Sequence, residues 1–321
     1  MLNPALTQNH APMQTPVFQG GAALPSGAGQ STSYRTPIPP EPVEAFDLPH
    51  PQVPAGSFAS GTGLEGLRIV HISDLHTRRI APASDRFRRL VDAMAATPAD
   101  LIVLTGDYTD EPGRELAAVD ALDRLSRAWG GAAPTLGAFG IFGNHDSTAM
   151  LHAAQGLERI TWLGGPGRRP RWATPHPRLR LVGLDYPEDF ISATLDAPPH
   201  ANAPDPGVLT IALAHYPTAI IPAASLGLPI VLAGHTHAGQ IRLSSRLAPH
   251  TSSDVPAHLA SGILRLGQTL CCISRGIGDG VFEGLRINCP WQIPLYTLRH
   301  GPLPPPPRHS PAHAVTQVVP W

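Results

Sequence analysis

Five short blocks of acidic, histidine and amide residues recur along the middle of the sequence, each directly after an apolar run. In chain order the blocks contain Asp74 and His76, Gly106-Asp107, Gly143-Asn144-His145-Asp146, His215, and Gly234-His235-Thr236-His237. Carboxylates, imidazoles and amide oxygens together suit borderline divalent cations. Each residue alone has a plainer explanation, because an aspartate after a glycine can cap a turn and a histidine can simply pack. The joint pattern, rather than any single block, therefore predicts metal-dependent chemistry.

The apolar runs that precede the blocks predict buried strands, with amphipathic helices between them. Leu67–Ser73 and Leu101–Thr105 lead into the first two blocks, and further strands are expected near 136–142, 179–184, 208–214 and 230–233. One helical face is formed by Phe87, Leu90, Val91 and Met94, and another by Leu116, Val119, Leu122 and Trp129. Ligand sites of α/β proteins lie at the carboxyl ends of sheet strands. We therefore expect the five blocks to meet at one edge of a sheet.

The last part of the pattern differs from the first. Strands are predicted at Gly262–Leu266, Gln268–Ser274 and Ile293–Arg299, with no helix between them. The chain thus opens with βαβ units and closes with a β meander. Two packed sheets with helices outside accommodate both halves. The predicted fold class is α/β, a four-layer αββα sandwich of two mixed sheets flanked by helices.

Proline is concentrated at both ends of the chain. Residues 1–62 are rich in Pro, Gly, Ser and Gln, and the tail from 301 to 321 contains the run PLPPPPR. Segments of this composition bury too little apolar surface to offset their ordering entropy. We therefore predict a disordered segment at 1–62, one folded domain at 63–300 and a disordered tail at 301–321.

Charge and cysteine content exclude several classes of function. The formal net charge is −1, and all 23 basic residues are arginine, which excludes a P-loop lysine and a Schiff-base lysine. A near-zero charge also disfavours a nucleic-acid partner. Three cysteines without a CxxC pair and no secretory signal predict a cytoplasmic protein, free or peripheral to the membrane. The uncharged stretch 208–234 is broken by three prolines, so no transmembrane helix is expected.

Taken in order, the five blocks resemble the calcineurin-like metallophosphoesterase superfamily over residues 66–299. The downstream text GHTHAGQI, ISRGIGDG and LRINCPWQIPLYTLR is most similar to its bacterial YkuE/YaeI-type branch. One departure is Trp291, because relatives commonly carry an acidic residue there.

The resemblance implies a site with two divalent metal ions, with Mn, Fe, Zn, Ni and Co all as candidates. It assigns one ion to Asp74, His76, Asp107 and His237, and the other to Asp107, Asn144, His215 and His235. Asp107 would bridge the two ions. His145 would protonate the leaving oxygen and Asp146 would orient its imidazole.

The implied reaction is hydrolysis of a phosphodiester or pyrophosphate bond by a metal-activated hydroxide. Protein phosphatases of the superfamily usually carry an arginine shortly after the GD block, where this chain has Glu111, which argues against a phosphoprotein substrate. Arg275 is the candidate phosphate contact. The expected substrate is a phosphoester, nucleotide- or lipid-linked.

Three alternatives remain open from the sequence: a non-catalytic scaffold on the same fold, a phosphomonoesterase, and a nuclease. Scaffolds typically lose ligand residues, and here every one of them is present. A nuclease would need a basic surface for its substrate.

Overall fold

The computed structural model describes part of the 321-residue chain. The described residues are 43–78, 84–129, 134–165, 171–184, 207–244, 247–251, 253, 255–282, 284–307 and 314–320. All of them belong to the compact unit that spans residues 36–321.

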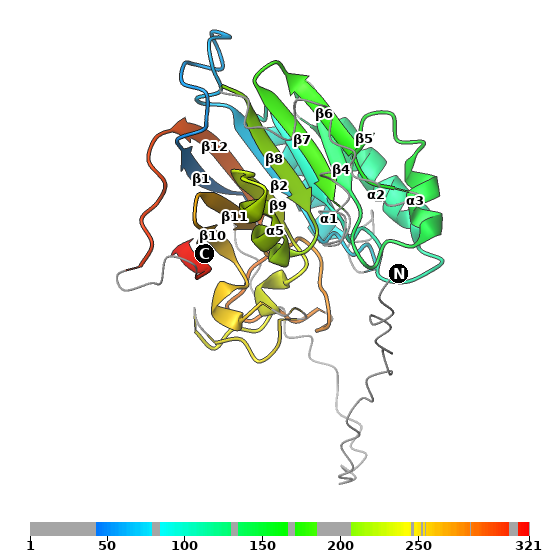
Figure 1. Cartoon of the computed structure of the whole chain (residues 1–321). Helices are drawn as coiled ribbons and strands as arrows, with labels where there is room; N and C mark the ends of the chain where they lie inside the picture. The colour runs from blue at the N-terminus through cyan, green and yellow to red at the C-terminus, as the bar shows by residue number, and fades with distance from the viewer. Residues whose placement is uncertain are drawn as a thin grey trace, which may run out of the picture. The chain divides into compact units, whose positions relative to one another are not determined.

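The first of two mixed sheets carries the strands that lead into the early blocks (Figure 1). Its strand order is β1-β12-β2-β3-β4-β5. β2, β3, β4 and β5 are parallel to one another, β12 is antiparallel to β2, and β1 is parallel to β12. In that spatial order the bounds are Val43–His50, Ile293–His300, Arg68–Ile72, Leu101–Thr105, Ala138–Ile141 and Thr161–Trp162.

The second sheet carries the strands before the last two blocks and has the order β13-β10-β11-β9-β8-β7-β6. β11, β9, β8 and β7 are parallel, whereas β13, β10 and β6 pair antiparallel with their neighbours. In that order the bounds are Thr316–Val319, Gly262–Leu266, Thr269–Ile273, Ile230–Ala233, Leu209–Ala214, Leu179–Leu184 and Arg171–His176. Buried side chains of the two sheets form one shared cluster, which includes Ile69, Val103, Ile211 and Leu232.

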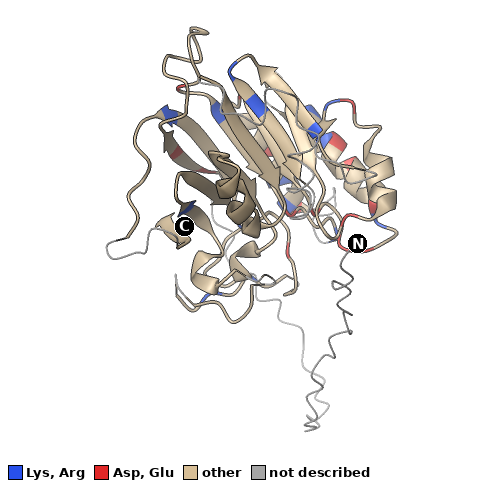
Figure 2. Cartoon of the chain, in the orientation of Figure 1, with Lys and Arg blue, Asp and Glu red and all other residues tan. Residues whose placement is uncertain are grey.

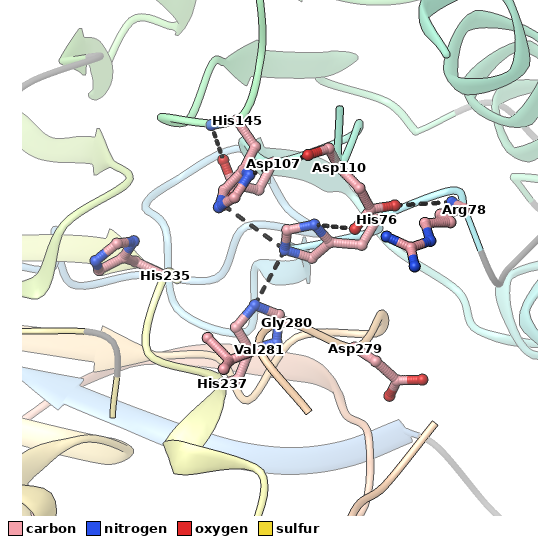
Figure 3. A pocket seen from close by; sticks show the side chains of 10 residues that line it. All are labelled: His76, Arg78, Asp107, Asp110, His145, His235, His237, Asp279, Gly280 and Val281. Carbon is pink, nitrogen blue, oxygen red and sulfur yellow. Dashed lines mark hydrogen bonds and ion pairs between the residues drawn. The ribbon is translucent and has the colours of Figure 1, made fainter. Parts of the chain in front are cut away.

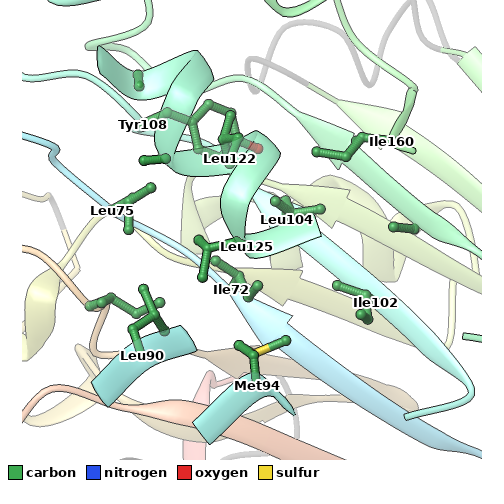
Figure 4. Packing of buried hydrophobic residues seen from close by; sticks show 14 of the residues in the cluster. Ile72, Leu75, Leu90, Met94, Ile102, Leu104, Tyr108, Leu122, Leu125 and Ile160 are labelled. Carbon is green, nitrogen blue, oxygen red and sulfur yellow. The ribbon is translucent and has the colours of Figure 1, made fainter. Parts of the chain in front are cut away.

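Helices cover the outer face of each sheet, which completes the predicted αββα layering. On the first sheet these are α1 (Asp85–Ala96), α2 (Glu115–Ala128) and α3 (Thr148–Ala154). Their apolar faces pack on β2 and β3 in one cluster, part of which Figure 4 shows. On the second sheet, α5 (Ile220–Ser225) follows the 3-10 helix η1 (Pro217–Ala219), and the cluster there contains residues of α5, β8 and β9. Two further 3-10 helices are η2 (His237–Gly239) and η3 (Ala257–Leu259).

Local sequence explains why these elements form where they do. α1 begins after Ser84, whose hydroxyl accepts a hydrogen bond from the amide of Phe87 and so satisfies one free donor of the first turn. Phe87, Leu90 and Met94 are its buried stripe, as the spacing predicts. β3 is buried at all five positions, as expected for a central parallel strand covered on both faces.

Charge and hydropathy patterns agree with the sequence interpretation. Arginines and acidic residues are interspersed on the ribbon of Figure 2, and most of it is uncharged. None of the helices in the described part of the chain is long and apolar enough to span a bilayer. The uncharged stretch 208–234 forms β8, η1, α5 and β9.

Two strands lie beyond the predicted domain boundaries, one at each end. β1 lies within the segment predicted to be disordered and pairs with β12 over its whole length. β13 lies within the predicted tail and pairs with β10. Averaged composition concealed short apolar patterns in both segments, since Leu48 is fully buried and Val319 packs against the core between the sheets. Both are edge strands, where proline is tolerated. Residues 1–42 lie outside the described residues.

Removing the Glu44 carboxylate should destabilise the fold, because this residue of β1 pairs with Arg275, whose side chain is only 2% exposed. Truncating one partner of a fully buried pair typically costs about 3–5 kcal/mol. Glu44 itself is 37% exposed, so we expect Glu44→Ala to lower the free energy of unfolding by about 2 kcal/mol. Asp47→Ala is the matched control on the same strand, because its ion pair with Arg299 is largely exposed. Equal urea midpoints for the two variants would contradict this prediction.

Candidate metal centre and active site

The five sequence blocks meet at one edge of the two sheets. Each follows the carboxyl end of a parallel strand: β2, β3, β4, β8 and β9. Four of the five blocks, all but that of His215, line one pocket together with Arg78, Asp110 and the loop of residues 279–281 (Figure 3). Its lining residues are His76, Arg78, Asp107, Asp110, His145, His235, His237, Asp279, Gly280 and Val281.

The backbone of these loops adopts an uncommon conformation at the candidate ligands. Eight non-glycine residues with positive φ occur in the described part of the chain, and five of them are Asp74, His76, Asp107, His235 and His237. Such conformations persist only where surrounding structure holds them, and they cluster at functional sites. The turns after the strands thus aim these side chains at a common point.

Glycines in two blocks allow the loops to approach one another. A Cβ atom on Gly143 would lie 2.2 Å from Oδ1 of Asp107. One on Gly234 would lie 2.4 Å from Oδ2 of Asp74. These distances are shorter than any real contact, so the GNHD and GHTH blocks need glycine at their first position.

Asp74, His76 and His237 form the first of two groups whose ligand atoms converge. Nε2 of His237 lies 3.0 Å from Nε2 of His76 and 3.5 Å from Oδ1 of Asp74. All three residues are buried.

Asp107, His215 and His235 form the second group. Nε2 of His215 lies 3.2 Å from Oδ2 of Asp107, 3.1 Å from Oδ1 of Asn144 and 3.2 Å from Nδ1 of His235. Oδ2 of Asp107 also lies 3.7 Å from Nε2 of His76 in the first group. This one carboxylate oxygen therefore faces both groups.

The contacts of two imidazoles agree with a cation in each group. Nδ1 of His76 lies 2.8 Å from a carboxylate oxygen of Asp110, and Nδ1 of His215 lies 2.7 Å from the carbonyl oxygen of Thr105. Both Nδ1 atoms must donate, so in the neutral rings Nε2 presents a lone pair. These lone pairs face carboxylate and amide oxygens, which are also acceptors. A divalent cation satisfies such a donor set, and the Nδ1 contacts are those typical of metal-bound histidine.

The same carboxylates govern the pKa values of the two histidines. Burial lowers the pKa of His76, but Asp110, Asp107 and Asp74 outweigh it and raise the pKa to about 9. Burial likewise lowers the pKa of His215, and Asp107 and Asp74 raise it to about 9. The acidic side chains thus create a strong negative potential at both groups.

These pKa shifts predict that metal affinity rises with pH. Below a pH of about 9, binding must displace the protons of His76 and His215. Each displaced proton makes the apparent dissociation constant fall about tenfold per pH unit. We expect the apparent dissociation constant for Mn²⁺ to fall by at least about tenfold per pH unit between pH values of about 6.5 and 8.5. Competition with a chelator of known affinity measures it. A dissociation constant that does not change over this range would contradict the assignment of these two imidazoles.

His145 lies at the pocket but outside both groups. The residue is exposed, and its ring is 5.3 Å from that of His76. Its Nδ1 atom lies 3.3 Å from the carbonyl oxygen of Asp110, and its backbone amide donates to Oδ1 of Asp107 at 2.9 Å. The ring can therefore reach a substrate, while its backbone supports the shared carboxylate.

Residues 67–239 match the calcineurin-like phosphoesterase family. This stretch is more than half of the chain. The chain belongs to the calcineurin-like phosphoesterase family. Members of this family are metal-dependent, and the two Asp/His groups could hold their ions.

Curated relatives match most of the family domain at modest identity. Phosphodiesterase YaeI of Escherichia coli is 28% identical over 240 residues, which cover 72% of this chain and 82% of YaeI. The uncharacterized metallophosphoesterase YkoQ of Bacillus subtilis is 26% identical over 225 residues, 63% of this chain and 77% of YkoQ. UDP-2,3-diacylglucosamine pyrophosphatase LpxG of Chlamydia trachomatis is 24% identical over 295 residues, 74% of this chain and 85% of LpxG.

Asp146, predicted to orient the His145 ring, binds the backbone of two loops. Its buried carboxylate accepts hydrogen bonds from the backbone amides of Asp107, Tyr108, Thr109 and Gly143. The residue thus ties the loops after β3 and β4 of this phosphoesterase together. Adjacency in sequence suggested a His-Asp pair, whereas the hydrogen bonds of this carboxylate in the described part of the chain go to backbone amides.

Arg275, the predicted phosphate contact, is not among the described residues that line the pocket. It is 1% exposed, pairs with Glu44 and donates from Nε to the carbonyl oxygen of Pro290 at 3.0 Å. The guanidinium therefore holds β1 and the loop before β12 in place. Its carboxylate partner, Glu44, belongs to β1, a strand that the sequence interpretation did not predict.

Three pocket residues were missed by the sequence interpretation. One oxygen of Asp110 lies 2.8 Å from Nδ1 of His76, and the other accepts from the backbone amide of Arg78 at 2.8 Å. Arg78 lines the pocket two residues after His76. Asp279 also lines the pocket and forms ion pairs with Arg86 and Arg286. The second acidic residue in GDYTD was the available signal for Asp110.

Proposed function

We propose that this phosphoesterase hydrolyses phosphodiester or pyrophosphate bonds with a binuclear metal centre. The observation that carries the proposal is the pair of adjacent ligand groups that one oxygen of Asp107 faces, with His145 beside them and outside both groups. The relatives agree with this bond type, since YaeI is named a phosphodiesterase and LpxG a pyrophosphatase.

In this proposal one set of residues binds the cations and His145 transfers a proton. Two bound divalent cations would activate a water and neutralise phosphate oxygens. Asp74, His76 and His237 would hold one cation, and Asn144, His215 and His235 the other, with Asp107 shared. As the water oxygen bonds to phosphorus and the bond to the leaving oxygen breaks, His145 gives a proton to that oxygen. Its Nδ1 faces the carbonyl of Asp110, which leaves Nε2 for this transfer.

Arg78 is our candidate for the phosphate contact. It is the only arginine among the described residues that line the pocket, where it lies beside Asp110. Glu111, by contrast, is absent from the described lining and pairs with Arg114 on the surface. A guanidinium binds two phosphate oxygens at once, and a lysine does so less well.

Arg78→Ala should raise KM more than it lowers kcat. We expect KM for bis-p-nitrophenyl phosphate to rise about tenfold, because a charge-assisted hydrogen bond is worth about 1.5–3 kcal/mol. Arg78→Lys should recover part of the loss. Arg88→Ala on the exposed face of α1 is the control, since Arg88 is exposed and pairs with Asp85 of the same helix. An unchanged KM in Arg78→Ala would remove this residue from the substrate site.

The proposed function is tested by assaying the Mn²⁺-reconstituted chain on a substrate panel. The panel contains bis-p-nitrophenyl phosphate, p-nitrophenyl phosphate, cyclic nucleotides, UDP-sugars and UDP-diacylglucosamine. We expect turnover of diesters or pyrophosphates to exceed that of the monoester. Faster turnover of the monoester would favour a phosphomonoesterase. Full metal loading without turnover of any substrate would favour a non-catalytic scaffold.

A cytoplasmic location stays a prediction. Cys271, Cys272 and Cys289 are buried free thiols, which agrees with a reducing compartment.

A further inference from the structure

Exposed apolar side chains gather next to the pocket. Eight large hydrophobic residues are exposed in the described part of the chain, and five of them lie in segments 240–247 and 280–287. These five, which we name the apolar rim, are Leu243 (67% exposed), Leu247 (53%), Val281 (60%), Leu285 (41%) and Ile287 (40%). Exposed apolar residues concentrated in this way mark a binding surface more often than scattered ones do.

The two segments of the apolar rim are held together by hydrogen bonds. The amide of Ile287 donates to the carbonyl of Gln240, and that of Arg242 donates to the carbonyl of Ile287, both at 2.9 Å. The buried side chain of Gln240 donates to the carbonyl of Phe282 at 2.9 Å and accepts from its amide at 3.1 Å. The rim is therefore a built surface rather than two independent loops.

The apolar rim begins inside the pocket. Val281 belongs to the rim and lines the pocket as well, next to Gly280 and Asp279 (Figure 3). A Cβ on Gly280 would lie 2.9 Å from the His237 ring, so this loop lies directly against a candidate metal ligand. A molecule whose phosphate occupies the pocket can thus extend an apolar group over Val281 onto the rest of the rim.

We propose that the apolar rim binds the alkyl or acyl chain of an amphiphilic phosphoester substrate. The inference rests on the proposed function, because the phosphate of that substrate occupies the metal centre. Because Val281 belongs to both the pocket and the rim, the alkyl or acyl chain that binds there is expected to be part of the substrate itself.

The described arginines of the two segments, Arg242 and Arg286, are buried and donate inward. These two arginines are therefore not available to bind an anionic membrane surface.

Alkyl p-nitrophenyl phosphates with methyl, hexyl and decyl groups test the proposal on the Mn²⁺-loaded full chain, below their micelle concentrations. Each methylene removed from water improves affinity about two- to fourfold. We therefore expect kcat/KM to rise at least about tenfold from methyl to decyl. Leu243→Ser with Leu285→Ser should abolish this rise and leave the methyl ester unaffected. Leu116→Ser is the matched control, since Leu116 is 82% exposed on α2, outside the rim.

Several outcomes would overturn the inference. A wild-type protein that hydrolyses all three esters equally well has the proposed function but no binding site for the alkyl chain. Two further outcomes assume that the esters show no chain-length preference. If the wild type binds phosphatidylglycerol vesicles and the double variant does not, the rim binds a membrane. If the wild type sediments as a dimer and the double variant does not, the rim binds a second copy.

Titration calorimetry measures binding to the rim independently of hydrolysis at the metal centre. Decyl phosphate should bind the wild-type chain more tightly than methyl phosphate, and the double variant should bind the two equally. That result without hydrolysis of any ester would retain the rim and reject the proposed function. Equal binding of the two phosphates by the wild type would reject the rim.

Discussion

Asp107→Asn should abolish the proposed binuclear centre and sharply reduce turnover. Oδ2 of Asp107 faces both ligand groups, and Oδ1 accepts the amide of His145. Asparagine keeps the shape but replaces one oxygen by an NH2 group, which cannot bind a cation. We expect turnover to fall by at least about 10²–10³-fold, the size of one electrostatic contact in an active site.

Elemental analysis of Mn²⁺-reconstituted protein gives the direct measurement. The wild type should approach two ions per chain, and Asp107→Asn should retain at most one. Asp110→Asn is the matched control, because Asp110 contacts the Nδ1 atom of His76 and belongs to neither ligand group. It should retain both ions and lose about 10–100-fold in activity. A wild type that binds no ion under several metals would reject the enzyme hypothesis.

The convergence of the five blocks could be predicted from sequence because it follows from sheet geometry. Buried apolar runs identify β2, β3, β4, β8 and β9, and parallel strands bring their carboxyl ends to one edge. Residue types then indicate the chemistry. The positive φ angles at Asp74 and His235 could not be read from sequence, since they depend on the packing of loops from both sheets.

Long-range pairing explains what sequence reasoning missed. Arg275 and Glu44 are separated by 231 positions, and nothing in either local sequence indicates the other. A basic residue in a loop near the motifs therefore suggested a phosphate contact, although its charge is used inside the fold. Arg78 was passed over because its place at the pocket depends on the hydrogen bond from its amide to Asp110. In both cases the tertiary partner, rather than the residue type, decides the role.

Replacing His145 by alanine should slow the chemical step while both ions stay bound. The variant keeps the backbone amide that donates to Oδ1 of Asp107 at 2.9 Å, so the shared carboxylate stays in place. It loses the exposed ring that lies beside, and outside, the two ligand groups. General acid catalysis is worth about 10²–10⁴-fold. We therefore expect kcat to fall by about that factor for substrates with alkoxide leaving groups.

Substrates with different leaving groups distinguish a general acid at His145 from a merely structural residue. p-Nitrophenolate departs without a proton, so the defect of His145→Ala should shrink on p-nitrophenyl esters. His235→Ala is the contrasting variant, because His235 belongs to the second ligand group and its loss should remove metal and activity together. If His145→Ala also loses metal, its ring supports the centre rather than the substrate. If its defect is equal for good and poor leaving groups, the ring stabilises charge at the phosphate and transfers no proton to the leaving oxygen.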